Sequence, residues 1–216
     1  MQAQFGFCLA KIVFLPMTEF LNASVKHLYY KCKKVSEASN VDSLSSLISD
    51  EFGLPPMLFK NIESVLEFFF KQYQNENIIL VLDEYPYLRE NVKGLDSIIQ
   101  SLIDKYKDNS QVKLLLLGSF VDVMNSLLEH SNPLYGRIDL TINLKQLDYL
   151  ETSKFYPEYS LEDKVRLYSV FGGIPYYNKL VDPRKTVRQN IIDLIASEGA
   201  RLENEVEMYL NSEISK

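Results

Sequence analysis

Apolar side chains form an unbroken run at Ile78–Leu82, and two carboxylates, Asp83 and Glu84, follow it directly. A run of this kind predicts a strand buried on both faces, as in a parallel sheet covered by helices. The two acids then lie at the carboxyl end of that strand, where open α/β sheets bind their ligands. This segment therefore predicts both the centre of the fold and a candidate site.

A second segment, Val112–Leu117, is apolar except for Lys113 and leads straight into Gly118 and Ser119. Between the two runs, Leu95–Lys107 has apolar residues at helical spacing, which predicts an amphipathic helix. The order strand, helix, strand implies parallel neighbours joined by a right-handed crossover. We therefore expect Ser119 to lie beside Asp83 at the same edge of the sheet.

The rest of the chain contains shorter patterns of the same two kinds. Segments typical of strands are Lys11–Leu15 and Ile138–Leu144. Segments with apolar residues at helical spacing are Phe20–Val35, Val41–Phe52, Asn61–Gln74, Val121–Leu128, Leu161–Phe171, Val187–Ile195 and Leu202–Ile214. Only helical patterns occur after Gln146. The sequence thus predicts an α/β domain over residues 1–146 and a small all-helical subdomain over residues 147–216.

Composition narrows the classes of function. The chain has 216 residues, 46% of them hydrophobic, which is enough for a full core. A net charge of -6 argues against direct binding of a nucleic-acid backbone. Cys8 and Cys32 have no metal-binding spacing and fit a reducing cytoplasm. No apolar run approaches the ~20 residues of a membrane helix, so we expect a cytoplasmic protein without membrane contact.

An apolar strand followed by Asp-Glu is typical of a Walker B segment. In such a segment Asp83 would hold Mg²⁺, usually through water, and Glu84 would polarise the water that attacks the γ-phosphate. Successive strand residues point to opposite sides, so the two acids would do different jobs. The alternative is a polar strand end that caps the next helix.

Four segments occur in an order that resembles a known family: Ile78–Glu84, Leu114–Ser119, Pro133–Arg137 and Gly172–Tyr177. They are similar to the prokaryotic AAA-type, STAND-like P-loop ATPases, an archaeal-type ATPase domain. The resemblance implies a P-loop NTPase-like parallel sheet flanked by helices, followed by a helical, lid-like subdomain. It also implies ATP and Mg²⁺ as ligands and a protein partner or appended effector domain, and it allows an oligomer.

The resemblance assigns a role to each matching residue. Asp83 is similar to the Mg²⁺-coordinating acid, and Glu84 to the catalytic base that orients water. Ser119 is similar to the sensor residue that contacts the γ-phosphate. Arg137 resembles a catalytic arginine that stabilises the transition state or acts as a finger. Pro175 resembles the turn residue that packs near the adenine of the nucleotide.

Simpler interpretations of these residues stay open. Ser119 would cap the helix that follows it. Arg137 would form a surface ion pair with Asp139 or Glu129. The segment Gly172–Pro175 would be a helix stop followed by a turn.

The chain departs from the family pattern in one respect: it contains no G-x-x-x-x-G-K-[ST] loop, because none of its eight glycines precedes a lysine. We therefore expect a shortened family member that lacks the Walker A loop and the downstream domains. Its hydrolysis of ATP would be weak or absent. The alternative is a degenerate ATPase fold that serves as a protein-interaction or scaffold module.

Overall fold

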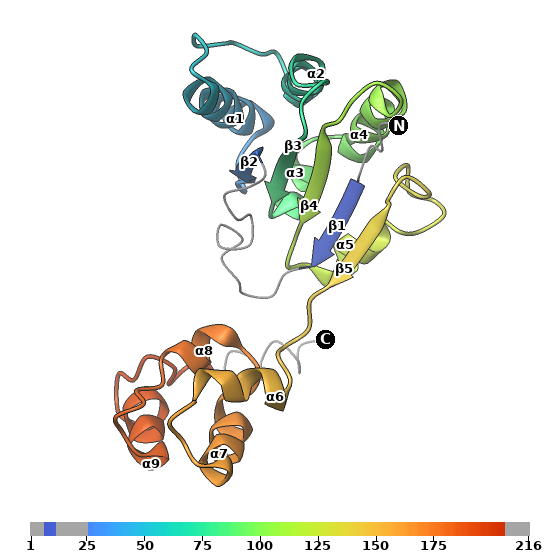
Figure 1. Cartoon of the computed structure of the whole chain (residues 1–216). Helices are drawn as coiled ribbons and strands as arrows, with labels where there is room; N and C mark the ends of the chain where they lie inside the picture. The colour runs from blue at the N-terminus through green and yellow to red at the C-terminus, as the bar shows by residue number, and fades with distance from the viewer. Residues whose placement is uncertain (1–6, 12–25, 206–216) are drawn as a thin grey trace. The chain divides into compact units, whose positions relative to one another are not determined.

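The computed structural model of the chain describes residues 7–11 and 26–205 (Figure 1). The chain divides into two compact units, of which the first ends at Leu144 and the second continues from Lys145. Each unit has a hydrophobic core of its own.

The first unit is built on a five-stranded sheet with the strand order β2-β3-β4-β1-β5. The strands are β1 (Phe7–Lys11), β2 (Lys26–Lys31), β3 (Ile78–Asp83), β4 (Lys113–Leu117) and β5 (Leu140–Asn143). Every neighbouring pair is parallel, and the arrows in Figure 1 point the same way. All carboxyl ends therefore share one edge of the sheet. This confirms the predicted α/β fold with a parallel sheet flanked by helices.

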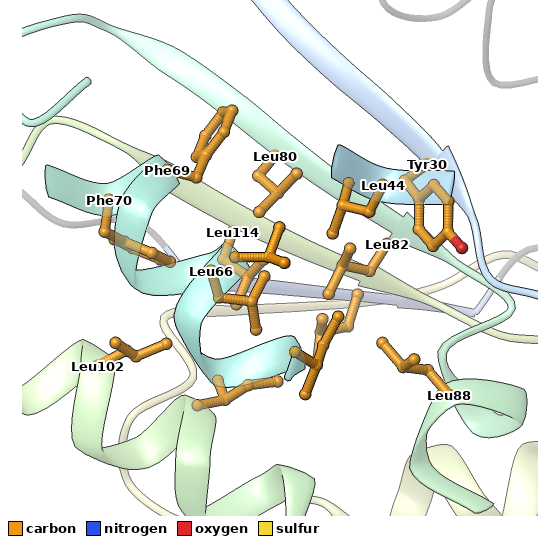
Figure 2. Close-up of a cluster of buried hydrophobic side chains, with 14 of the residues drawn as sticks. Tyr30, Leu44, Leu66, Phe69, Phe70, Leu80, Leu82, Leu88, Leu102 and Leu114 are labelled. Atoms are coloured by element: carbon orange, nitrogen blue, oxygen red, sulfur yellow. The ribbon is translucent and has the colours of Figure 1, made fainter. Parts of the chain in front are cut away.

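Three helices cover one face of the sheet: α1 (Glu37–Phe52), α2 (Ile62–Gln72) and α4 (Leu95–Tyr106). Alternate strand residues such as Leu80 and Leu82 pack against Leu66 and Phe69 of α2, as Figure 2 shows. Helices α1 and α2 begin at residues whose side chains cap them, Ser36 and Asn61. Asn61 forms a capping box at the start of α2, with its side chain accepting from the amide of Ser64.

Two short helices follow the central strands. They are α3 (Tyr85–Asn91), which follows β3, and α5 (Val121–Ser126), which follows β4. The apolar pattern does not predict α3. Its signal is Pro86, whose fixed φ suits the first turn of a helix.

The predicted helix at Phe20–Val35 is wrong in its described part, because Lys26–Lys31 forms strand β2. Leu28 and Tyr30 are buried while the residues between them are less so, which is the period of two expected of a strand. Helical spacing and alternation overlap in this segment, and pairing with β3 decides between them.

The N-terminal strand lies earlier than predicted. It spans Phe7–Lys11 and overlaps the predicted strand Lys11–Leu15 at Lys11, and residues 12–15 lie outside the described residues. This strand lies between β4 and β5, inside the sheet.

The second unit is helical. It contains α6 (Tyr149–Thr152), a 3-10 helix (Ser153–Phe155), α7 (Leu161–Phe171), α8 (Pro175–Lys179), α9 (Val187–Ile191) and a π-helical turn (Ile192–Ala196). The end of the predicted helix Leu202–Ile214 lies outside the described residues. No helix within residues 26–205 has the length and apolar character needed to span a bilayer.

A backbone contact holds the start of this helical unit against the turn after α7. The amide of Leu147 donates to the carbonyl of Gly173 at 2.9 Å. A Cβ at position 173 would lie 1.9 Å from the carbonyl oxygen of Leu147, so only glycine allows this approach.

Candidate functional site

The structure brings Asp83, Glu84 and Ser119 together at the carboxyl edge of the sheet. Asp83 ends β3, and Ser119 follows the end of β4, the parallel neighbour of β3. The hydroxyl of Ser119 donates to Oε2 of Glu84 at 3.2 Å. We call these three residues the carboxyl rim. Their roles toward a nucleotide stay predictions.

Each carboxylate oxygen of Asp83 accepts one hydrogen bond from another group of the chain. The phenol hydroxyl of Tyr29 donates to Oδ2, and the backbone amide of Glu84 donates to Oδ1 at 3.0 Å. Burial, and then the hydrogen bond to Asp83, raise the pKa of Tyr29, so this hydroxyl keeps its proton at neutral pH. The sequence pattern did not indicate Tyr29 as a site residue, because the pattern predicts a helix at this position. The alternation of Leu28 and Tyr30 was the available signal.

Glu84 adopts a left-handed backbone conformation, with φ 52° and ψ 42°. It is the sole non-glycine residue with positive φ within the described ranges. A bulky residue in this region is strained, and such strain persists only where the surroundings impose it. Because β3 ends at Asp83, Glu84 lies in this turn and not in the strand. The turn, and not strand alternation, therefore sets the direction of the Glu84 side chain.

The simpler capping interpretations of these residues are not observed. Glu84 occupies the N-cap position of α3, but its side chain makes no capping hydrogen bond. The N-cap of α5 is Phe120 and not Ser119, and the side chain of Phe120 makes no capping hydrogen bond.

A close contact between the two loops fixes the spacing of the rim. A Cβ at Gly118 would lie 2.7 Å from Cδ of Pro86 and 2.8 Å from Sδ of Met124. Glycine at position 118 lets the chain after β4 pass directly against the first turn of α3. The contact thereby holds Ser119 within reach of Glu84.

A buried carboxylate, Asp96, ties α3 to α4 and to the loop after α5. It accepts from the hydroxyl of Tyr85 at 2.6 Å, from Nε of Arg89 at 2.9 Å and from Nδ2 of Asn132 at 2.8 Å. Burial, and then the charge of Asp96, raise the pKa of Tyr85. The network fixes α3, whose first residues define the turn at Glu84. The apolar pattern gave no signal for it.

The structure does not bring Arg137 to the carboxyl rim. Its Nη2 lies 2.8 Å from Oδ2 of Asp104, and its Nε lies 3.0 Å from Oδ1. Asp104 is in the last turn of α4, the helix that leads back to the amino end of β4, and Arg137 itself precedes β5. The pair therefore lies at the amino edge of the sheet. The ion-pair partner is Asp104, and the catalytic role of Arg137 stays a prediction.

Pro175 belongs to the second unit, where it is buried in the first turn of α8. Gly172 ends α7 as its C-cap, so the segment does act as a helix stop. A role of Pro175 in nucleotide binding stays a prediction.

The donor set at the rim fits Mg²⁺ bound together with a phosphate. No group of three or more His, Cys, Asp or Glu side chains suited to a metal occurs in the part of the chain that the structure describes. Mg²⁺ usually keeps several waters and binds through one or two carboxylates plus substrate phosphates, so it needs no such cage. Asp83 would hold the ion, and Glu84 and Ser119 lie beside it.

Comparison with solved structures identifies the class of fold. The chain superposes on the Walker-type ATPase PABY2304 of Pyrococcus abyssi with a TM-score of 0.65 and 14% identity, covering 98% of this chain and 71% of that one. It superposes on the ORC2 protein of Aeropyrum pernix, solved with ADPNP and ADP, with a TM-score of 0.51 and 14% identity over 90% of this chain and 51% of that one. The fold is thus that of a P-loop ATPase.

Comparison of sequences identifies the family. Residues 14–181 match the family described as an ATPase domain predominantly from Archaea. The chain belongs to this family. It also matches the uncharacterised protein MJECL04 of Methanocaldococcus jannaschii, with 33% identity over 100 residues. These residues make up 46% of this chain. The match spans 23% of the length of that relative.

Proposed function

We propose that the chain is an AAA-type, STAND-like ATPase domain that binds Mg²⁺·ATP at the carboxyl rim and acts as a nucleotide-driven switch. The observation that carries the proposal is the meeting of Asp83, Glu84 and Ser119 where two parallel strands end, with Ser119 bonded to Glu84 at 3.2 Å. Membership of the ATPase family and the order of the four segments support it. The low cysteine content supports a cytoplasmic location.

Each rim residue has a chemical task under this proposal. Asp83 would hold the cation, which would supply positive charge to the bound nucleotide. Glu84 accepts a hydrogen bond from the attacking water and aligns it with the γ-phosphorus. The Ser119 hydroxyl exchanges its bond to Glu84 for one to the γ-phosphate.

We propose that this chain hydrolyses ATP slowly. Its sequence contains no Walker A lysine, because none of its glycines precedes a lysine. Negative charge that develops on the γ-phosphate would therefore lack the lysine that a Walker A loop supplies, and the cation that Asp83 would hold becomes a main counter-charge. Removal of a single stabilising contact of this kind typically lowers kcat by about 10²- to 10³-fold.

The test is a thermal shift with millimolar Mg²⁺·ATP, followed by a hydrolysis assay. A ligand at 100 times its dissociation constant stabilises the folded state by about 2.7 kcal/mol, which raises Tm measurably. We expect a shift in the wild type that Asp83→Asn removes. We expect the slow hydrolysis to disappear in Glu84→Gln while the shift remains. Hydrolysis at an unchanged rate in Glu84→Gln would show that another residue is the base.

A hollow beside the rim favours a second candidate, a protein-interaction module. Its volume is about 450 Å³, and it is lined mainly by apolar atoms of residues that include Pro86, Tyr87, Phe120 and Val123. The rings of Tyr87 and Phe120 pack edge to face with centroids 5.6 Å apart, and Phe120 is 46% exposed. A wild-type chain that shows no thermal shift with Mg²⁺·ATP would favour this function over the first.

A further inference from the structure

We infer that Tyr29 is a positioning residue, whose hydroxyl holds the Asp83 carboxylate in the orientation that receives a divalent cation. The inference rests on the proposed function, because it concerns how the proposed metal ligand is held. It adds a residue that the sequence pattern did not single out.

The register of the sheet places Tyr29 beside Asp83. In the β2–β3 pair, Tyr29 is opposite Val81 and Lys31 is opposite Asp83. Residues opposite each other, and residues two apart on one strand, point to the same face of the sheet. Tyr29 and Asp83 are therefore diagonal neighbours on one face, and the phenol ring spans the distance to Oδ2.

Packing fixes the Tyr29 ring before any ligand binds. The ring lies against a small apolar cluster on this face of the sheet, formed around the buried residues Val81 and Leu117. A tyrosine side chain has only two rotatable χ angles, so a packed ring holds its hydroxyl at a defined place. A flexible lysine on the same strand could not position a partner in this way.

Two donors from two different elements control the rotation of the carboxylate. The amide of Glu84 occupies one lone pair of Oδ1, and the hydroxyl of Tyr29 occupies one lone pair of Oδ2. An ionised carboxylate has about four lone-pair sites, so each oxygen keeps one for a further partner. Without the hydroxyl, one hydrogen bond remains and the group can turn about its Cβ–Cγ bond. Outer partners that orient a metal ligand typically contribute 10–100-fold to metal affinity.

The adjacent residue provides a matched control. Tyr30 points to the opposite face, is 4% exposed, and donates to Oδ1 of Asn40 at 2.7 Å. Its hydroxyl therefore has a structural partner that is not one of the rim carboxylates. Removal of the Tyr30 hydroxyl should lower stability, whereas removal of the Tyr29 hydroxyl should lower affinity for the cation.

The experiment titrates the full chain with Mn²⁺·ATP and follows the relaxation enhancement of water protons, which reports bound Mn²⁺ without any turnover. We expect Tyr29→Phe to weaken binding by about 10–100-fold. We expect Tyr30→Phe to bind Mn²⁺·ATP with an affinity within about twofold of the wild type. We expect the double variant Tyr29→Phe/Asp83→Asn to bind it no more weakly than Asp83→Asn alone, because the effects of coupled residues are not additive.

Three contrary results have different meanings. Equal binding by Tyr29→Phe and the wild type, together with weak binding by Asp83→Asn, would overturn the role of Tyr29 and leave the proposed function intact. Equal binding by Asp83→Asn and the wild type would overturn both. Losses of the same size in Tyr29→Phe and Tyr30→Phe would show that the effect of Tyr29 is only structural.

Discussion

The left-handed conformation of Glu84 leads to a prediction with an unusual sign. At most positions a glycine is less favourable than an alanine, by roughly 0.5–1 kcal/mol, because glycine loses more conformational entropy on folding. At position 84 the backbone has φ 52°, where a Cβ is strained. We therefore predict that Glu84→Gly is more stable than Glu84→Ala.

The size of the difference follows from two opposing terms. The left-handed conformation costs an L-residue roughly 1–2 kcal/mol, and glycine does not bear this cost. The entropy of glycine in the unfolded chain subtracts roughly 0.5–1 kcal/mol. Both variants lose the hydrogen bond from Ser119, so that contact cancels. The expected net difference lies in the range of about 0 to 1.5 kcal/mol, centred on ~0.75 kcal/mol, in favour of glycine.

Urea unfolding of the two variants, followed by circular dichroism, measures this difference. A matched control is Ser101, an exposed residue in the middle of α4, where Ser101→Ala should be more stable than Ser101→Gly by about 1 kcal/mol. If alanine is also the more stable residue at position 84, the reasoning about strain at the rim is wrong.

Three further predictions concern the support of the rim and the opposite edge of the sheet. Asp96→Ala should lower the free energy of unfolding by about 3–5 kcal/mol, because it leaves buried donors, including a charged one, without a partner; a loss below about 1 kcal/mol in urea would contradict this. Gly118→Ala should lower it by about 1–3 kcal/mol, since the new Cβ would meet Pro86 at 2.7 Å, and an unchanged Tm would show that the loops move apart freely. Arg137→Gln should cost at most about 1 kcal/mol at pH 7. The hydrogen bond from Arg137 holds the pKa of Asp104 below its usual value. The stability that the pair contributes is therefore present above the unfolded pKa of about 3.9 and fades as the pH falls through the lower folded value. A destabilisation by Arg137→Gln that persists unchanged in acid would exclude the ion pair as its cause.

The central part of the fold could be predicted because its signals are unambiguous. The apolar runs Ile78–Leu82 in β3 and Leu114–Leu117 in β4 fit no exposed helix, and their order along the chain favours a parallel pair. The shared position of Asp83 and Ser119 followed from topology alone. Asn61, which the sequence offers as a helix cap, forms a capping box.

The errors come from segments whose pattern has two solutions. Leu28, Tyr29 and Cys32 fit a helical stripe, and Leu28, Tyr30 and Cys32 fit a strand, so the partner strand decides. Arg137 had acidic neighbours in the sequence, yet its partner Asp104 comes from a helix 33 residues away. Contacts of this range, like that of Tyr29 with Asp83, depend on packing that no local pattern records.

The most direct test of the account locates the cation. Mn²⁺·ATP added to the isotope-labelled chain should broaden the amide resonances of Asp83, Glu84 and Ser119, because paramagnetic broadening falls steeply with distance from the ion. The amide of Arg137, at the amino edge of the same sheet, should stay sharp, and Asp83→Asn should restore the rim resonances. Broadening that is centred on another part of the chain, or that persists in Asp83→Asn, would contradict the assignment of the carboxyl rim as the nucleotide site.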